Sequence, residues 1–176
     1  MARLMGRRPD PTPRMARAAR RHLPHGETVL AGVQVQRPGT LQAALAGGVS
    51  GATGTTPGLL PRLTDDDRSW VRAAAEFGID PPLAQRAIYL ALVLTPSRLL
   101  LLRRSRLTKR VREPLAVWPV ADVDRIEVPR GGGTLTIHRA GAALRLELPL
   151  AHRFLPEVYR ELPALLARAQ AATETP

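Results

Sequence analysis

The densest group of chemically active side chains is a run of cations at residues 103–112. Its sequence is RRSRLTKRVR, and its six basic residues are Arg103, Arg104, Arg106, Lys109, Arg110 and Arg112. Like charges placed this close together repel one another and do not favour a fold. We therefore expect these side chains to protrude together from a hairpin and to bind an anionic surface or partner. A solvated hairpin tip without any partner is the alternative.

Three classes of partner fit such a cluster: anionic lipid, an acidic protein, and nucleic acid, in that order. Each basic residue near an anionic membrane adds about 1 kcal/mol of attraction, so the cluster could dock without a specific pocket. Aromatic residues make up only 3% of the chain, which argues against a module that stacks exposed bases. A nucleic-acid binder would instead contact phosphates.

Catalytic chemistry finds no support in the sequence. The four histidines are His22, His25, His138 and His152, and none lies in a triad context or at a metal-ligand spacing. Glu127 and Glu147 stand alone, so paired acid–base carboxylates are not supported. With no cysteine, thiol catalysis and thiolate metal sites are also excluded. We expect a non-catalytic protein with no cofactor and no metal.

The net charge of +11 comes from two segments. Residues 1–26 hold seven arginines against one aspartate, and residues 98–112 hold six arginines and one lysine with no acid. The N-terminus lacks the apolar stretch of a secretory signal, and no window supplies the roughly 20 apolar residues of a transmembrane helix. We expect a cytoplasmic protein, with peripheral attachment at the inner face of the membrane as one option.

The first part of the chain predicts an arm, a strand and an insertion. Residues 1–26 combine arginine and proline with little apolar periodicity, which predicts a largely disordered arm, although Arg14 to Arg21 could form a short basic helix. Val33 and Val35 alternate with glutamines, as in a half-buried strand over residues 27–36. Residues 38–61 carry no charge and are rich in glycine and threonine, which predicts a long loop.

The loop could instead dip into a membrane or fold against a partner, with Leu59 and Leu60 as anchors. After it, a capping threonine and Asp65, Asp66 and Asp67 precede apolar residues at helical spacing, which predicts a helix over residues 65–78. We read the three acids as stabilising the helix N-terminus, not as a cation site.

The second half of the chain predicts closely spaced strands. Ile88 to Leu94 and Leu99 to Leu102 are apolar runs joined by the turn residues 95–98, because a continuous helix would have to hold Pro96 in its interior. Further strands follow in PLAVW, DVDRIEV, TLTIHR and ALRLEL. The last segment, residues 152–170, has an amphipathic helical pattern that Pro163 should kink or interrupt. Strands at this spacing indicate a small antiparallel sandwich or barrel.

The order of these elements resembles the pleckstrin-homology (PH) fold. VLTPSRLLLLRR resembles the leucine-threonine-x-x-arginine-leucine hairpin of bacterial PH-like and GRAM-like domains of the actinobacterial type, and PLAVWPVADVDRIEV resembles the strand pair that follows it. The resemblance covers residues 27–168 and implies an α+β fold. That fold is a bent, seven-stranded antiparallel barrel capped by a C-terminal amphipathic helix. Here residues 38–86 form a loop-plus-helix insertion after the first strand, and residues 169–176 form a disordered tail.

The resemblance implies an interaction module. In lipid-binding eukaryotic PH domains the basic signature lies between the first two strands, whereas here that connection holds the uncharged stretch, so we do not carry over phosphoinositide recognition. Two alternatives stay open. One is a nucleic-acid binder that clamps phosphates with the arm and hairpin. The other is a protein scaffold that uses the barrel edge or the helix bearing Trp70 and Phe77.

Overall fold

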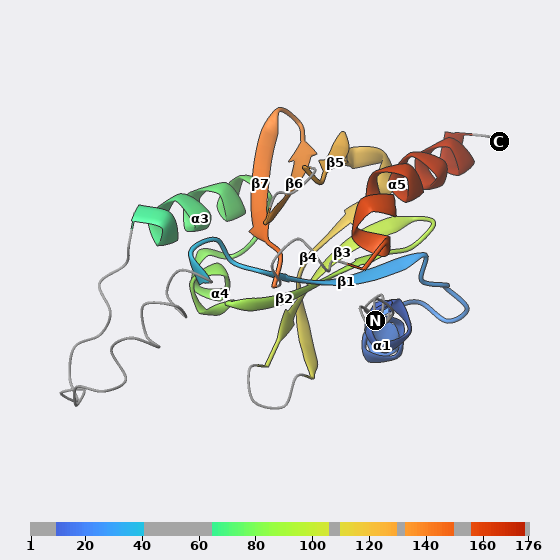
Figure 1. Ribbon diagram of the computed structural model, residues 1–176, viewed down its shortest axis with the longest axis horizontal. Coiled ribbons are helices and arrows are strands. Elements are labelled where there is room, and N and C mark those ends of the chain that lie inside the picture. Colours follow the sequence, from blue (N-terminus) through green and yellow to red (C-terminus); the bar gives the residue numbers. More distant parts are fainter. Residues whose placement is uncertain (1–9, 41–64, 106–109, 130–132, 150–155, 175–176) are drawn as a thin grey trace, which may run out of the picture.

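The computed structural model describes residues 10–40, 65–105, 110–129, 133–149 and 156–174 (Figure 1). In chain order the elements are α1 (Thr12–Ala19), η1 (Arg20–His22), β1 (Ala31–Gln36), α3 (Asp65–Glu76), α4 (Pro81–Arg86), β2 (Tyr89–Leu94), β3 (Arg98–Arg104), β4 (Val111–Pro119), η2 (Val120–Asp122), β5 (Arg125–Glu127), β6 (Thr134–Arg139), β7 (Ala142–Glu147) and α5 (Val158–Glu174).

The strands form one seven-stranded sheet in the order β4-β3-β2-β1-β7-β6-β5. All neighbouring pairs are antiparallel, so the expected α+β class with an antiparallel sheet and a C-terminal helix is confirmed. The two hairpins β2–β3 and β6–β7 are also where the apolar pattern predicts them. In Figure 1, β6 and β7 stand upright while β1 and β2 run across the view, so the sheet is strongly bent.

The expectation of a barrel is wrong in one respect, because the sheet does not close. Strands β4 and β5 form its two edges and do not pair with each other. The short helix η2 and the terminal helix α5 lie between these edges instead. The side-chain amide of Gln170 on α5 donates hydrogen bonds to the carbonyl oxygens of Val120 and Val123. These bonds satisfy backbone carbonyls of η2 and of its C-terminal cap.

The main core lies inside the bend of the sheet and is covered by α3 and α5. Alternate residues of β1 and β2, such as Val33 and Leu92, face this core and are fully buried. From α3, Trp70 donates a hydrogen bond to the carbonyl of Ala84, and the ring of Phe77 meets Trp118 edge-on at 5.6 Å between ring centres. The helix expected at residues 65–78 therefore belongs to the domain core.

Parts of the insertion lie outside the described residues. They comprise residues 41–64, a range that contains the candidate anchors Leu59 and Leu60. The helix α4, which follows α3 directly, is an element that the sequence pattern did not predict. Its first residues are Pro81 and Pro82, which suit a first helical turn because no intrahelical bond to their nitrogen is needed there.

A second, smaller core lies on the opposite face of β2 and β3, beneath α1. Here Ala91, Val93, Leu100 and Leu102 pack with other buried residues, which include Met15 and Ala19 of α1. The expectation of a largely disordered arm is therefore wrong for residues 10–26. Its physical reason is that β2 and β3 are apolar on both faces, and α1 buries the face that the main core leaves uncovered.

Close contact between α1 and β1 depends on Gly32. A Cβ atom at this position would lie 2.5 Å from the Cβ of Met15, which is far inside van der Waals contact. The backbone N–H of Gly32 also donates a hydrogen bond to Oγ1 of Thr12 at 3.2 Å. Only a residue without a side chain lets the helix lie this near to the strand.

The edge of β1 that faces β7 is satisfied mostly by side chains. Strands β1 and β7 pair at one position, between Gln36 and Glu147. Two residues earlier, the hydroxyl of Tyr159 accepts a hydrogen bond from the N–H of Gln34 at 3.1 Å and donates one to its carbonyl at 2.7 Å. The phenol of Tyr159 on α5 thus takes the place of a strand partner at Gln34. Of the strand pairs in the sheet, β1 and β7 share the fewest paired residues.

The terminal helix is longer than expected. It runs unbroken to Glu174 and contains Pro163, so the expected disordered tail is wrong for residues 169–174 and the helix is not interrupted at the proline. Leu162 and Leu166 are buried against the main core, and this packing outweighs the hydrogen bond that proline cannot donate.

The turn between β2 and β3 is held by a carboxylate from the preceding segment. Oε1 of Glu27 accepts hydrogen bonds from the hydroxyls of Thr95 at 2.5 Å and Ser97 at 2.7 Å, and it lies 3.3 Å from Nε of Arg98. Burial raises the pKa of Glu27, but the two hydroxyls and the arginine more than offset it, so the pKa is lowered overall. The predicted turn at residues 95–98 is therefore confirmed and firmly anchored.

Candidate binding site at the root of the basic hairpin

The six basic residues singled out in the sequence do not all protrude together. Arg106 and Lys109 lie outside the described residues. At the end of β3, Arg103 contacts Oε1 of Glu113 at 2.7 Å, and its side chain is 33% exposed. The next residue, Arg104, is 9% exposed. Because successive side chains of a strand point to opposite faces, the two arginines cannot act as one exposed pair.

The remaining two members of the run are exposed and lie beside the N-terminal segment. Arg110 and Arg112 flank Val111, the first residue of β4. The guanidinium of Arg21 donates a hydrogen bond to the carbonyl of Val111. Burial and the charge of Arg21 lower the pKa of His22, while the backbone of Arg112 and the carboxylate of Glu113 partly offset this change. These interactions fix η1 against the start of β4.

The fold thus joins two positive segments that are far apart in the sequence. Along α1 and η1 the exposed arginines lie on the side away from Met15 and Ala19, which are buried against the sheet. We give the name basic face to the exposed arginines of both segments that do not line the pocket described below; they are Arg17, Arg20, Arg21, Arg110 and Arg112. Figure 1 shows α1 and the described ends of the β3–β4 hairpin on the same side of the sheet.

Next to the basic face lies a polar pocket of about 310 Å³. The strand register places Gln36, Tyr89 and Arg104 in one row across β1, β2 and β3. Gln34 stands two residues before Gln36 and therefore points to the same face. The other lining residues are Arg14, Val35, Ser105 and Pro149. The pocket is thus built from three adjacent strands, from α1 and from the segment after β7.

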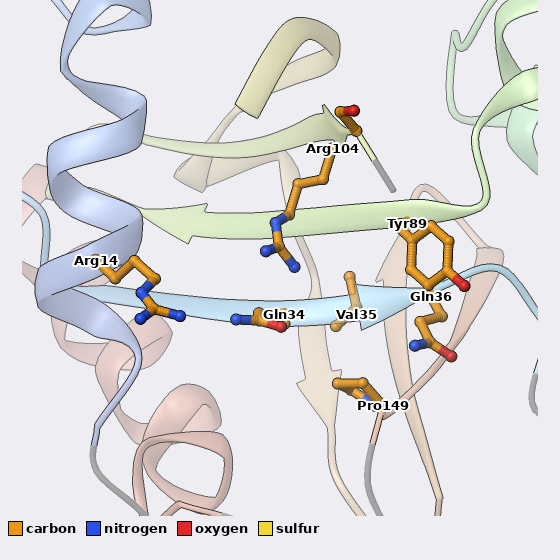
Figure 2. Close-up of a pocket in the computed structure, with 8 residues that line it drawn as sticks. Arg14, Gln34, Val35, Gln36, Tyr89, Arg104 and Pro149 are labelled. Carbon is orange, nitrogen blue, oxygen red and sulfur yellow. The ribbon is translucent and has the colours of Figure 1, made fainter. Parts of the chain in front are cut away.

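Two arginines converge on the floor of this pocket. Figure 2 shows the guanidinium groups of Arg14, from α1, and Arg104, from β3, both directed toward Gln34. Burial lowers the pKa of Arg104, the phenol oxygen of Tyr159 partly offsets this, and the charge of Arg14 lowers it further. Arginine remains charged under all ordinary conditions. The pocket is therefore electropositive, and the eight lining residues include no acid.

Of the pocket's residues, the sequence pattern singles out only Arg104 as a binding residue, and it predicts a protruding position for it on the hairpin. The pattern places Arg14 in a basic arm, and it places Gln34 and Gln36 on the polar side of a half-buried strand. The sequence feature that indicates the pocket is the polar, even-numbered face of β1, which occurs together with a basic amphipathic segment. Its meaning depends on strand register and on the docking of α1, neither of which is visible in the sequence.

Other candidate chemistry is explained by surface pairing or by burial. Glu127 is not alone, because it contacts Nε of Arg125 at 2.7 Å and Nε2 of His138 at 3.2 Å across the β5–β6 pair. Trp70 and Phe77 are only 2% and 1% exposed, so these two side chains pack in the core and are not available to a partner. Within the described ranges, no group of three or more histidines and acids could hold a metal ion.

No helix in the described part of the chain has the length and apolar character needed to cross a bilayer. Comparison with protein-family models finds no match, and comparisons with curated proteins and with solved structures find no significant match.

Proposed function

We propose that this protein is a non-catalytic, PH-like interaction module that docks on an anionic lipid surface through its basic face. The observation that carries the proposal is the contact of η1 with β4, through Arg21 and Val111. It unites the positive charge of the arm and of the hairpin on one side of the molecule. The bent seven-stranded sheet with its terminal helix supports the PH-like reading.

The physical argument rests on the number and exposure of the charges. All five arginines of the basic face are exposed, and each adds about 1 kcal/mol of attraction when it lies near an anionic membrane. Their long stems can also lie along the headgroup region while the guanidinium groups bind phosphates. Attraction of this type needs no complementary pocket and depends strongly on ionic strength.

The test is co-sedimentation with vesicles of phosphatidylcholine, with and without phosphatidylserine. We expect wild-type protein to bind only the anionic vesicles. The variant Arg17→Glu/Arg20→Glu/Arg110→Glu/Arg112→Glu should lose this binding. A matched control, Arg72→Glu/Arg86→Glu/Arg160→Glu/Arg168→Glu, makes the same change in net charge at four exposed arginines on α3, α4 and α5, and it should keep most of the binding.

Three outcomes would contradict the proposal. Wild-type protein that ignores anionic vesicles would overturn lipid docking. Equal losses in the two variants would show that net charge, not the basic face, governs binding. Binding of the protein to duplex DNA at physiological salt, without any vesicle binding, would favour a nucleic-acid function. The affinity of the protein for DNA should then fall steeply as the salt concentration rises.

A further inference from the structure

We propose that the pocket between α1 and the β1–β3 face binds a small tetrahedral oxyanion, of the phosphate monoester kind, and that the bound anion fastens α1 to the sheet. The site is separate from the basic face, because the guanidinium groups of Arg14 and Arg104 are directed toward Gln34 (Figure 2), whereas the five arginines of the basic face do not line the pocket. The inference therefore stands or falls independently of membrane docking.

The first argument is the convergence of two positive charges on one floor. Arg104 is nine-tenths buried, and a second arginine points at the same floor from α1 (Figure 2). A nearby like charge is unfavourable for a guanidinium, and the charge of Arg14 acts on Arg104 in this way. Oxygens placed between the two guanidinium groups would turn this repulsion into two attractive interactions. Forked guanidinium donors match the geometry of phosphate oxygens particularly well.

The second argument is the chemistry of the remaining lining. Gln34 and Gln36 carry amide groups that can donate hydrogen bonds, and Tyr89 and Ser105 carry hydroxyls that can do so. Gln34, Gln36 and Tyr89 stand on neighbouring strands in fixed register, and Ser105 directly follows β3, so the backbone positions of these donors are set before any ligand arrives. At about 310 Å³, the cavity is at the small end of the ~300–1,000 Å³ that is usual for ligand sites. It suits a compact group better than an extended chain.

The third argument concerns α1 itself. The helix has only eight residues, too few for stability in isolation, so its position depends on what it contacts. Met15 and Ala19 anchor its apolar side to the second core. An anion shared by Arg14 and Arg104 would add a polar clamp between helix and strand. Ligand binding and docking of α1 are then two parts of one equilibrium.

The experiment is a titration of ¹⁵N-labelled protein with inorganic phosphate and with glycerol 3-phosphate, with sodium chloride at matched ionic strength as the reference. We expect saturable shifts in the amide signals of Gln34 and Gln36 with the phosphates only. Amide hydrogen exchange within α1 should slow at saturation. The substitutions Arg14→Gln and Arg104→Met should each weaken binding by about tenfold or more, as loss of a charged hydrogen-bond donor predicts.

The matched control is Arg17→Gln, one turn further along α1 and outside the pocket, which should leave phosphate affinity unchanged. Arg14 and Arg17 are both exposed, so neither substitution threatens the fold even if Arg104→Met does. The proposal is overturned if the shifts do not saturate, if chloride reproduces them, or if Arg14→Gln binds phosphate as the wild type does.

Vesicles distinguish the two sources of the phosphate group. If the source is a lipid, vesicles with phosphatidic acid should bind more tightly than vesicles with an equal fraction of phosphatidylglycerol, and Arg14→Gln should abolish this preference. If the source is a soluble metabolite, the two vesicle types should bind alike while the titration with free phosphate still saturates. Loss of all vesicle binding with intact phosphate binding would refute membrane docking and leave the pocket assignment standing.

Discussion

A single hydroxyl completes the backbone hydrogen bonding of the central strand. The phenol of Tyr159 is bonded to both the N–H and the carbonyl of Gln34, and its ring is 2% exposed. Burial raises the pKa of Tyr159 to about 12, although the bond with Gln34 and the charge of Arg104 act in the opposite direction. This residue therefore links α5, β1 and the candidate pocket.

We expect Tyr159→Phe to lower the free energy of unfolding by about 1–3 kcal/mol, because it leaves two backbone groups without their partner. Chemical denaturation monitored by circular dichroism measures this change. Tyr89→Phe is the control, because Tyr89 is a half-buried residue that lines the pocket. A loss for Tyr159→Phe no larger than that of the control would show that water replaces the phenol at no cost.

The raised pKa also sets the sign of a dependence on alkaline pH. An unfolded tyrosine ionises near pH 10.0, whereas Tyr159 in the folded protein ionises near 12. Above pH 10 the unfolded state therefore releases a proton that the folded state keeps, and stability falls as pH rises toward 12. This component of the alkaline loss should be missing in Tyr159→Phe.

At the scale of elements, the docking of α1 on β1 depends on the absence of a side chain at Gly32. In Gly32→Ala the new Cβ would overlap the Cβ of Met15, which is a backbone-proximal atom that no rotamer change can move. We expect α1 to shift or detach. Amide exchange in α1 should then speed up by about an order of magnitude or more, as a loss of a few kcal/mol of local stability implies.

The rest of the sheet supplies the internal control for this substitution. Strands β6 and β7 are paired along their whole length and do not touch the substituted face, so their exchange should hardly change. Uniform acceleration across all strands would instead mean that Gly32→Ala destabilises the whole fold. Unchanged exchange in α1 would show that the helix has room to move without loss.

At the scale of the whole molecule, the two cores should differ in their dependence on the N-terminal segment. Removal of residues 1–22 would take away α1 and η1 and uncover Ala91, Val93, Leu100 and Leu102 on the outer face. We expect the truncated protein to keep its main core but to bind hydrophobic dyes and to self-associate, as an exposed apolar sheet face does. Removal of residues 1–9 alone is the control.

Dye fluorescence and sedimentation velocity measure this outcome. Retained β6–β7 protection in the truncated protein would confirm that the main core is intact. If the shortened chain remains monomeric and binds no dye, the second core does not need α1, and the helix is only loosely associated.

Much of this architecture could be predicted from local pattern. Alternation in β1, β6 and β7, the turn at Pro96, and the acidic start of α3 are signals carried within a few residues, so strands and helix were expected near their observed places. The docked helix α1 could not be predicted in the same way. The apolar residues of α1 are one methionine, Met15, and several alanines. They predict a buried helix face only when it is known that β2 and β3 present a second apolar face.

The candidate site was even less accessible to sequence reasoning. Arg103 and Arg104 are adjacent in the chain, yet one contacts Glu113 at the surface and the other is buried in the pocket. A charge run indicates that a region is positive but does not assign its members to faces. Strand register assigns each side chain to a face. Because the pairing of β3 with β4 contains two register shifts, this register cannot be obtained by counting residues along the sequence.

The single paired position between β1 and β7 has a consequence for the order in which the strands pair during folding. Strand β1 is synthesised before β7 and before the Tyr159 phenol, which together complete its edge. The β2–β3–β4 meander is local and should form first, because nearby segments lose less entropy when they pair. On a ribosome, the edge of β1 would stay open until β7 and α5 have been synthesised, and this is the period in which we expect wrong pairing between nascent chains to be greatest.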